Sequence, residues 1–197
     1  MKPGSRALGV AESYRGTDGA TSTLAGAVVR ADRTVDDFVF GTCTVGGSDA
    51  TDAIVDCWRR LDRADAQYVF VAGVALAWYN LVDLEAIAAA TDRPVLAVSF
   101  EASGGLSGAI AEAFDPPERD RRIEAYEALP DRRRLAVDGD ELFVRSVDVD
   151  DERADRVLRA FTHDRRTRSA LSSSTSTLRT NSSSPSTASR RWSGSAS

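Results

Sequence analysis

The chain has 197 residues, 42% of them hydrophobic and 28% charged, which is a composition typical of a soluble globular protein. Its net charge of −5 combines an acidic region, residues 1–163 with 19 basic and 29 acidic groups, and a basic one, residues 164–197 with six arginines and one aspartate. The acidic region excludes a broad phosphate-binding surface, while a local basic groove stays open. No apolar run reaches the roughly 20 residues that span a bilayer. Met1–Arg6 leads straight into a strand-like stretch, so we expect a cytoplasmic protein without membrane contact.

The first predicted elements are three strands joined by short connections. Alternating and β-branched apolar residues place them at Ala7–Ser13, Leu24–Arg30 and Val35–Thr44. Connections this short favour an antiparallel meander.

The apolar period then changes to that of a helix, which begins after Ser48 or Asp49 as its capping residue. The continuous apolar run Tyr68–Ala72 predicts a strand buried on both faces. After a loop over Gly73–Asn80, a helix over Val82–Ala90 and a strand over Val95–Phe100 complete a β-α-β-α-β progression.

The last part of residues 1–163 is predicted to be two helices, a hairpin and a final amphipathic helix. The first helix follows Gly104-Gly105 and ends at Phe114, and the other expected ranges are Pro116–Leu129, Leu135–Val137 with Leu142–Val147, and Asp150–Thr162. Residues 1–163 therefore predict one mixed α/β domain.

Residues 164–197 differ sharply in composition, because 18 of these 34 residues are Ser or Thr and few are large and apolar. Such a segment cannot offset its chain entropy by burial, so we expect disorder. Either it is a basic tail that touches nucleic acid, or it is an out-of-frame reading of a GC-rich gene, which the abrupt change of charge favours.

The acidic composition also indicates an environment. Aspartate outnumbers glutamate by 21 to 9 and Lys2 is the single lysine, a pattern that predicts a halophilic, salt-adapted protein. The two cysteines, Cys43 and Cys57, have no His or Cys cluster near them, so we expect buried free thiols.

Four stretches, in this order along the chain, resemble an archaeal family of unknown function related to endonuclease V, in the form found in salt-loving archaea. They are Lys2–Val10, Val45–Thr51, Ala72–Asp83 and Arg93–Leu96. The resemblance spans about Met1–Phe161 and implies a ribonuclease H-like mixed sheet with flanking helices.

The same resemblance implies a nuclease in which carboxylates hold Mg²⁺ at the ends of adjacent strands. The implied positions, after the first, third and central strands, are Ala11, Asp49 and Ala72, so two of the three carboxylates are absent. A methyl group cannot coordinate a hard cation. We therefore expect an uncharacterised endonuclease V-like protein without metal-dependent nuclease activity that binds nucleic acid or a nucleotide.

Two alternatives stay open. One is a weak Mg²⁺-dependent endonuclease with a rearranged site of Glu12, Asp49 and Asp83, in which Asp49 and Glu12 hold the metal. Glu12 neighbours Ala11 but points to the opposite face of the strand unless a bulge turns it. The other is a small-molecule or protein-binding module.

Three further residues are candidates for substrate binding. Asn80 either caps the helix that follows it or lines a polar pocket with Asp49 and Glu12. Trp78 and Tyr79 either stack on a base or pack beside the core strand.

The compact basic run Arg132–Arg134 either contacts phosphate or places surface charge on a linker, and we favour the linker.

Overall fold

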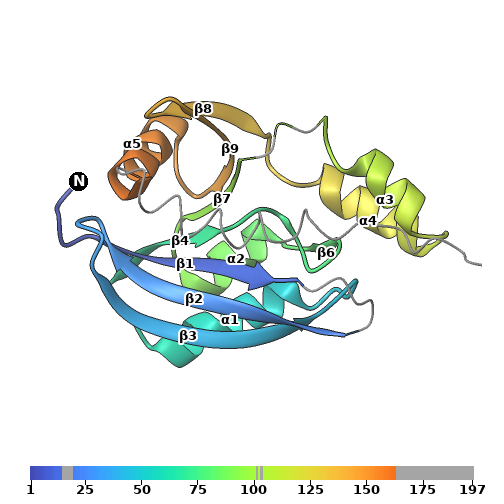
Figure 1. Ribbon diagram of the computed structural model, residues 1–197, viewed down its shortest axis with the longest axis horizontal. Coiled ribbons are helices and arrows are strands. Elements are labelled where there is room, and N and C mark those ends of the chain that lie inside the picture. The colour runs from blue at the N-terminus through green and yellow to red at the C-terminus, as the bar shows by residue number, and fades with distance from the viewer. Residues whose placement is uncertain (15–19, 101, 103, 163–197) are drawn as a thin grey trace, which may run out of the picture. The chain divides into compact units, whose positions relative to one another are not determined.

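The computed structural model describes residues 1–14, 20–100, 102 and 104–162 (Figure 1). The elements are, in chain order, β1 (Arg6–Ser13), β2 (Thr21–Arg30), β3 (Val35–Thr44), α1 (Ala50–Leu61), β4 (Ala66–Val71), β5 (Ala75–Leu76), β6 (Asn80–Leu81), α2 (Leu84–Thr91), β7 (Val95–Ser99), α3 (Ser107–Ala113), α4 (Glu118–Glu127), β8 (Arg133–Val137), β9 (Asp140–Val147) and α5 (Asp151–Thr162). The predicted tail lies outside the described residues, and its disorder stays a prediction.

Seven strands form one mixed sheet in the order β3-β2-β1-β4-β7-β9-β8. β1, β2 and β3 pair antiparallel, as the short connections predicted, and β4 and β7 continue the sheet in parallel. The prediction missed the small hairpin β5–β6, which lies in the expected loop Gly73–Asn80, because two-residue strands show no periodicity. In the part of the chain that the structure describes, no helix is long and apolar enough to cross a bilayer.

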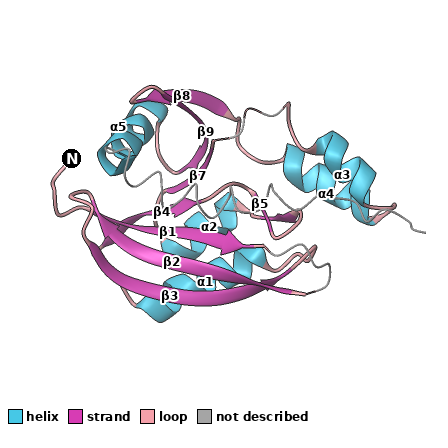
Figure 2. Cartoon of the chain, viewed as in Figure 1, coloured by secondary structure: helices cyan, strands magenta, loops and turns pink. Residues whose placement is uncertain are grey.

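The sheet has a separate apolar cluster on each face. Figure 2 shows α1 and α2 behind the strands β1, β2 and β3. Leu8 and Val10 of β1 are buried in the cluster that includes Ile54 of α1 and Ile87 of α2. Ala7 points the other way, into the cluster of Leu158 of α5. The alternation along β1 therefore supplies both cores, as strand geometry requires.

α1 packs closely against β3 at Gly41. A Cβ atom there would lie 2.8 Å from Sγ of Cys57, so a larger residue would push the helix away from the strand. Cys43 and Cys57 are both buried and free, which confirms the prediction from their isolation in the sequence.

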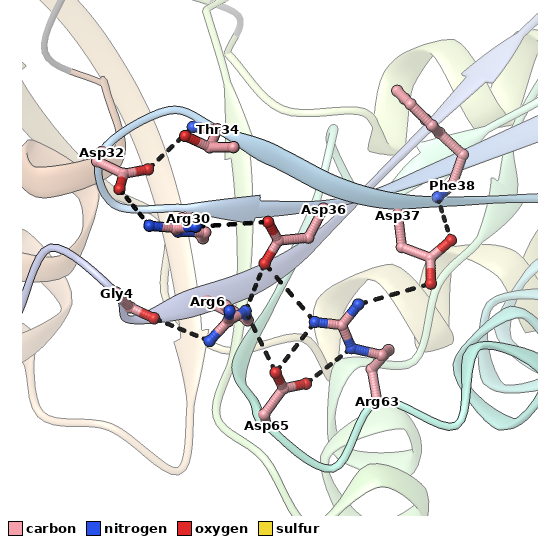
Figure 3. A network of polar contacts seen from close by, with 10 residues as sticks. All are labelled: Gly4, Arg6, Arg30, Asp32, Thr34, Asp36, Asp37, Phe38, Arg63 and Asp65. Atoms are coloured by element: carbon pink, nitrogen blue, oxygen red, sulfur yellow. Dashed lines mark hydrogen bonds and ion pairs between the residues drawn. The ribbon is translucent and has the colours of Figure 1, made fainter.

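A network of ion pairs joins the beginning of β1, the β2–β3 hairpin and the α1–β4 loop (Figure 3). Asp36, whose side chain is 16% exposed, lies 2.6 Å from Nε of Arg6, 3.6 Å from Nη2 of Arg63 and 3.8 Å from Nη1 of Arg30. Hydrogen bonds from Arg63 lower the pKa of Asp65, with help from the charge of Arg6. The network therefore stabilises the fold above the ordinary carboxyl pKa and weakens as the pH falls through the lowered one.

Replacement of Asp36 by asparagine is expected to lower the free energy of unfolding by about 2 kcal/mol, between the values for surface and buried ion pairs, because three arginines lose their shared carboxylate. Asp37→Asn is the matched control, since Asp37 is 44% exposed and lies 3.6 Å from Arg63 alone. Urea unfolding at low and high salt measures both variants. Equal effects of the two substitutions would contradict a central role for Asp36.

Candidate functional site

The ends of β1 and β4 lie next to each other at one edge of the sheet. Val10 pairs with Val71, and the N–H of Ala72 donates to the carbonyl of Val10 at 2.9 Å. Ala11 and Ala72 follow that pair on the two strands; Ala72 is exposed and Ala11 is partly buried. The positions where the resemblance implies metal-binding carboxylates are thus adjacent and accessible, but they present methyl groups.

Asp49 follows β3 and has its carboxylate bound by the protein itself. Oδ1 accepts from the N–H of Thr44 at 2.9 Å and from Nδ2 of Asn80 at 2.7 Å, and Oδ2 accepts from the Thr44 hydroxyl at 2.8 Å. Partial burial opposes ionisation, but the hydrogen bonds from Thr44 and Asn80 outweigh it and lower the pKa of Asp49. Asp49 is therefore an anion whose oxygens serve as structural acceptors.

Asn80, at the start of β6, is fully buried and links three segments. Its Nδ2 donates to Asp49 and to the carbonyl of Thr44 at 2.8 Å, and its Oδ1 accepts from the N–H of Ala50 at 3.0 Å. Two capping predictions were wrong here. Asp49 makes no side-chain cap of α1, because its carboxylate is turned to Thr44, and Asn80 caps α1, which precedes it, instead of α2.

Glu12 points toward the α1 side of the sheet and accepts from the hydroxyl of Ser22 at 2.7 Å. Ser22 pairs with Cys43 across β2 and β3. Burial, the charge of Asp49 and the charge of Glu12 raise the pKa of the Cys43 thiol to about 11. The thiol is therefore protonated near neutral pH, so it does not supply a thiolate nucleophile.

Asp83 lies apart from these carboxylates as the N-terminal cap of α2. Its Oδ1 accepts from the N–H of Ala86 at 2.9 Å, and its own N–H donates to the hydroxyl of Thr51 at 3.0 Å. Within residues 1–14, 20–100, 102 and 104–162, no three His, Cys, Asp or Glu side chains are grouped to hold a metal ion. Glu12, Asp49 and Asp83 are thus not brought together, and the residues at this edge do not fit Mg²⁺, which needs free oxygen ligands.

Trp78 and Tyr79 form the turn between β5 and β6. Ala77, Trp78 and Tyr79 all have positive φ angles, of 40°, 59° and 60°, a conformation that costs energy for non-glycine residues. Both rings pack on Phe114, with centroids 5.5 and 6.0 Å away, and both are half-buried. The rings therefore take part in packing within the fold, and base stacking by Trp78 and Tyr79 stays a prediction.

Arg122 of α4 holds this turn against the β3–α1 loop. Its side chain is 8% exposed. Its guanidinium donates to the carbonyl of Tyr79, to the carbonyl of Gly46 at 2.6 Å and to Glu118 at 2.8 Å. Sequence reasoning missed Arg122, because an arginine in a charged helix has no pattern that separates it from its solvated neighbours.

The Arg132–Arg134 run is not a linker, which corrects that interpretation, because Arg133 and Arg134 begin β8. Arg133 pairs with Asp151, at 2.9 Å, and with Asp155 of α5, and Arg134 pairs with Glu141 at 3.1 Å. Arg132 lies over the ring of Phe143. The run joins the hairpin β8–β9 to α5.

Solved structures of low sequence identity share this fold. A protein of unknown function from Archaeoglobus fulgidus matches with a TM-score of 0.68 and 21% identity, over 79% of this chain and 86% of that one. Human endonuclease V matches with a TM-score of 0.54 and 15% identity, over 89% of this chain and 84% of that one. Endonuclease V from Ciona intestinalis matches with a TM-score of 0.50 and 12% identity, over 79% of this chain and 77% of that one. That structure is a complex with a 24-mer DNA that contains an inosine followed by a ribo-adenosine. The predicted ribonuclease H-like, endonuclease V-like mixed sheet is confirmed.

Sequence comparisons identify archaeal relatives. A UPF0215 protein of Pyrobaculum calidifontis is 37% identical over 123 residues, which are 62% of this chain and 66% of that protein. A UPF0215 protein of Pyrobaculum aerophilum is 32% identical over 145 residues, 73% and 76% of the two chains. The sequence model of the family described as endonuclease dU matches residues 3–175. The chain thus belongs to the endonuclease dU family.

Proposed function

We propose that this protein is an endonuclease V-like member of its family that has lost metal-dependent strand cleavage and binds a nucleic-acid strand at the edge where β1 and β4 end. The observation that carries the proposal is the pair of alanines, Ala11 and Ala72, at adjacent and accessible ends of these strands. Cleavage by the route that the resemblance implies would need oxygen ligands at both positions.

The remaining carboxylate supports this proposal. Asp49 is engaged by Thr44 and Asn80, so a cation would have to compete with the hydrogen bonds that hold the start of α1 in place. A single carboxylate also binds Mg²⁺ weakly. The carboxylate of Asp49 therefore serves to stabilise the fold.

Binding without cleavage is supported by fold and access. The Ciona endonuclease V with the same fold is seen with an inosine-containing DNA. The strand ends of our chain reach solvent, but the acidic charge of residues 1–163 permits few phosphate contacts. We expect an affinity that depends only weakly on salt and persists at physiological ionic strength.

The test uses labelled single strands with one inosine, one deoxyuridine or neither, with Mg²⁺ or Mn²⁺. Fluorescence anisotropy is expected to show binding, and denaturing gels are expected to show intact strands at every metal concentration. Metal-dependent cleavage that Asp49→Asn abolishes would overturn the loss of activity. Binding that occurs only well below physiological salt would overturn the proposed recognition.

A gain-of-function variant tests the role of the two alanines directly. The double substitution Ala11→Asp and Ala72→Asp is expected to tighten Mn²⁺ binding by at least about tenfold, as measured by calorimetry, because it adds two oxygen ligands beside each other. Ala136→Asp is the matched control, since Ala136 is an exposed alanine of β8. Unchanged Mn²⁺ affinity in the double variant would show that the alanines do not explain the missing site.

A further inference from the structure

The edge strand β3 exposes its aromatic side chains to solvent. Phe38 and Phe40 are each 62% exposed and Val35 is 45% exposed, although most large apolar residues elsewhere in the sheet are buried or partly buried. Most soluble proteins bury such side chains, and a contiguous apolar patch marks an interaction surface. The patch meets the site at the ends of β1 and β4 at Ala11, which pairs with Ala25, the partner of Phe40.

Strand register shows what surrounds these rings. Val39 and Leu24, which alternate with the exposed residues, are buried toward α1. On the opposite face of the meander, which we call the open face, each phenylalanine stands beside small residues of β2 and β1. The two rows are Phe38–Ala27–Gly9 and Phe40–Ala25–Ala11.

The open face therefore has a ridge and a floor. The rings of Phe38 and Phe40 rise along one side, and Ala25, Ala27 and Gly9 form a low surface next to them. A Cβ atom on Gly9 would meet no atom closer than the Ala27 carbonyl at 4.0 Å, so the floor is open. In Figure 1, α1 and α2 lie behind β1, β2 and β3.

Charge decides which kind of partner suits the open face. Val29, Val35 and two threonines, Thr23 and Thr42, extend the two rows, so the paired residues of β1, β2 and β3 that the structure describes on this face are uncharged. Asp36 and Asp37 of the same strand turn to the other side, where they pair with Arg63. A nucleic-acid strand would need basic side chains around the aromatic rings, and a strongly charged protein partner would need opposite charge.

We propose that the open face binds a second copy of this chain. A twofold axis through the open face places the phenylalanines of each copy over the alanine and glycine floor of the other copy. The same surface is therefore complementary to itself. The two sheets then pack face to face about 10 Å apart, as in a β-sandwich. This proposal is independent of the loss of cleavage.

The size of the face predicts a reversible dimer. Three strands about 4.8 Å apart and about 33 Å long cover about 450 Å² on each copy, or about 900 Å² in total. This area lies below the standard size of stable interfaces. The two acidic copies repel each other, and salt screens that repulsion, so the dimer is expected to tighten as salt increases.

Sedimentation velocity of the full chain from about 1 to about 200 µM, at about 0.15 M and at about 2 M salt, tests the proposal. The expected result is a concentration-dependent dimer with a lower dissociation constant at high salt. Phe38→Ser with Phe40→Ser is expected to weaken the dimer by more than about tenfold. Ala25→Arg is expected to abolish it, because two like charges then meet near the axis.

The matched control is Ala136→Arg, an exposed alanine on the opposite edge strand β8, and it is expected to leave the dimer unchanged. Circular dichroism checks that each variant is folded. A chain that is monomeric throughout the range would overturn the proposal, and so would a dimer that neither open-face variant weakens. If the protein is monomeric and the Phe38/Phe40 variant loses nucleic-acid strand binding, the open face is a nucleic-acid surface. That result would also overturn the proposal.

Discussion

Replacing Asn80 with alanine is expected to lower the free energy of unfolding by about 3 kcal/mol, because it removes the three hydrogen bonds of a fully buried amide and takes the acceptor away from the buried N–H of Ala50. For a folded region of about this size, such a loss lowers the melting temperature by about 6–12 °C. Calorimetry or urea unfolding measures the effect. Gln67→Ala is the matched control, since Gln67 is an exposed amide in β4 of the seven-stranded sheet.

The effect of Asn80→Ala is also expected to depend on pH. Asp49 has a lowered pKa in the folded protein, so its contribution to stability is complete above its ordinary pKa and is lost as the pH falls through the lowered one. The variant lacks one donor that stabilises the carboxylate. The difference in the free energy of unfolding between the unchanged protein and the Asn80→Ala variant should therefore narrow under acidic conditions. A difference that is constant or grows on acidification would contradict the assignment of Asp49 as an anionic acceptor.

Replacing Arg122 with methionine is expected to lower the free energy of unfolding by about 3 kcal/mol, since the partly buried carbonyls of Tyr79 and Gly46 lose their charged donor. Arg122→Lys is expected to recover only part of this, because one ammonium cannot reproduce the planar set of donors. Hydrogen exchange should speed up at the Gly46 amide, which donates to Ala77 in the strained turn.

Arg121→Met is the matched control for Arg122. Arg121 is the preceding residue of α4, its side chain is 71% exposed, and it also pairs with Glu118, at 3.5 Å. We expect Arg121→Met to change the free energy of unfolding by less than about 0.5 kcal/mol. Similar losses for the two variants, or unchanged exchange at Gly46 in Arg122→Met, would contradict the assignment of Arg122 as the residue that positions both loops.

The two exposed phenylalanines show a limit of pattern reading. Phe38 and Phe40 helped to predict the strand Val35–Thr44, which the structure confirms, because aromatic residues favour extended backbone. The alternation does not tell which face of an edge strand is covered. Only the register of β1, β2 and β3 shows that the small residues and the rings share an uncovered face.

The candidate site shows a similar limit. The expectation that carboxylates are missing at Ala11 and Ala72 came from the sequence through its resemblance to an endonuclease V-related family. The roles of Asn80 and Arg122 could not be predicted, because the partners of Asn80 lie 30 or more residues away and those of Arg122 as many as 76. Such contacts form only after the chain folds back on itself, and a polar residue in the sequence does not indicate which distant backbone group it will meet.

The sequence by itself determined the α/β class, the order of the longer elements and the acidic charge, because these follow from local periodicity and from residue chemistry. The tertiary structure alone decided that Asp83 caps a helix, that Asp49 is held by Thr44 and Asn80, and that β3 exposes its rings. The physical reason is that hydrogen bonding and burial are properties of the space around a side chain, and packing of distant segments defines that space.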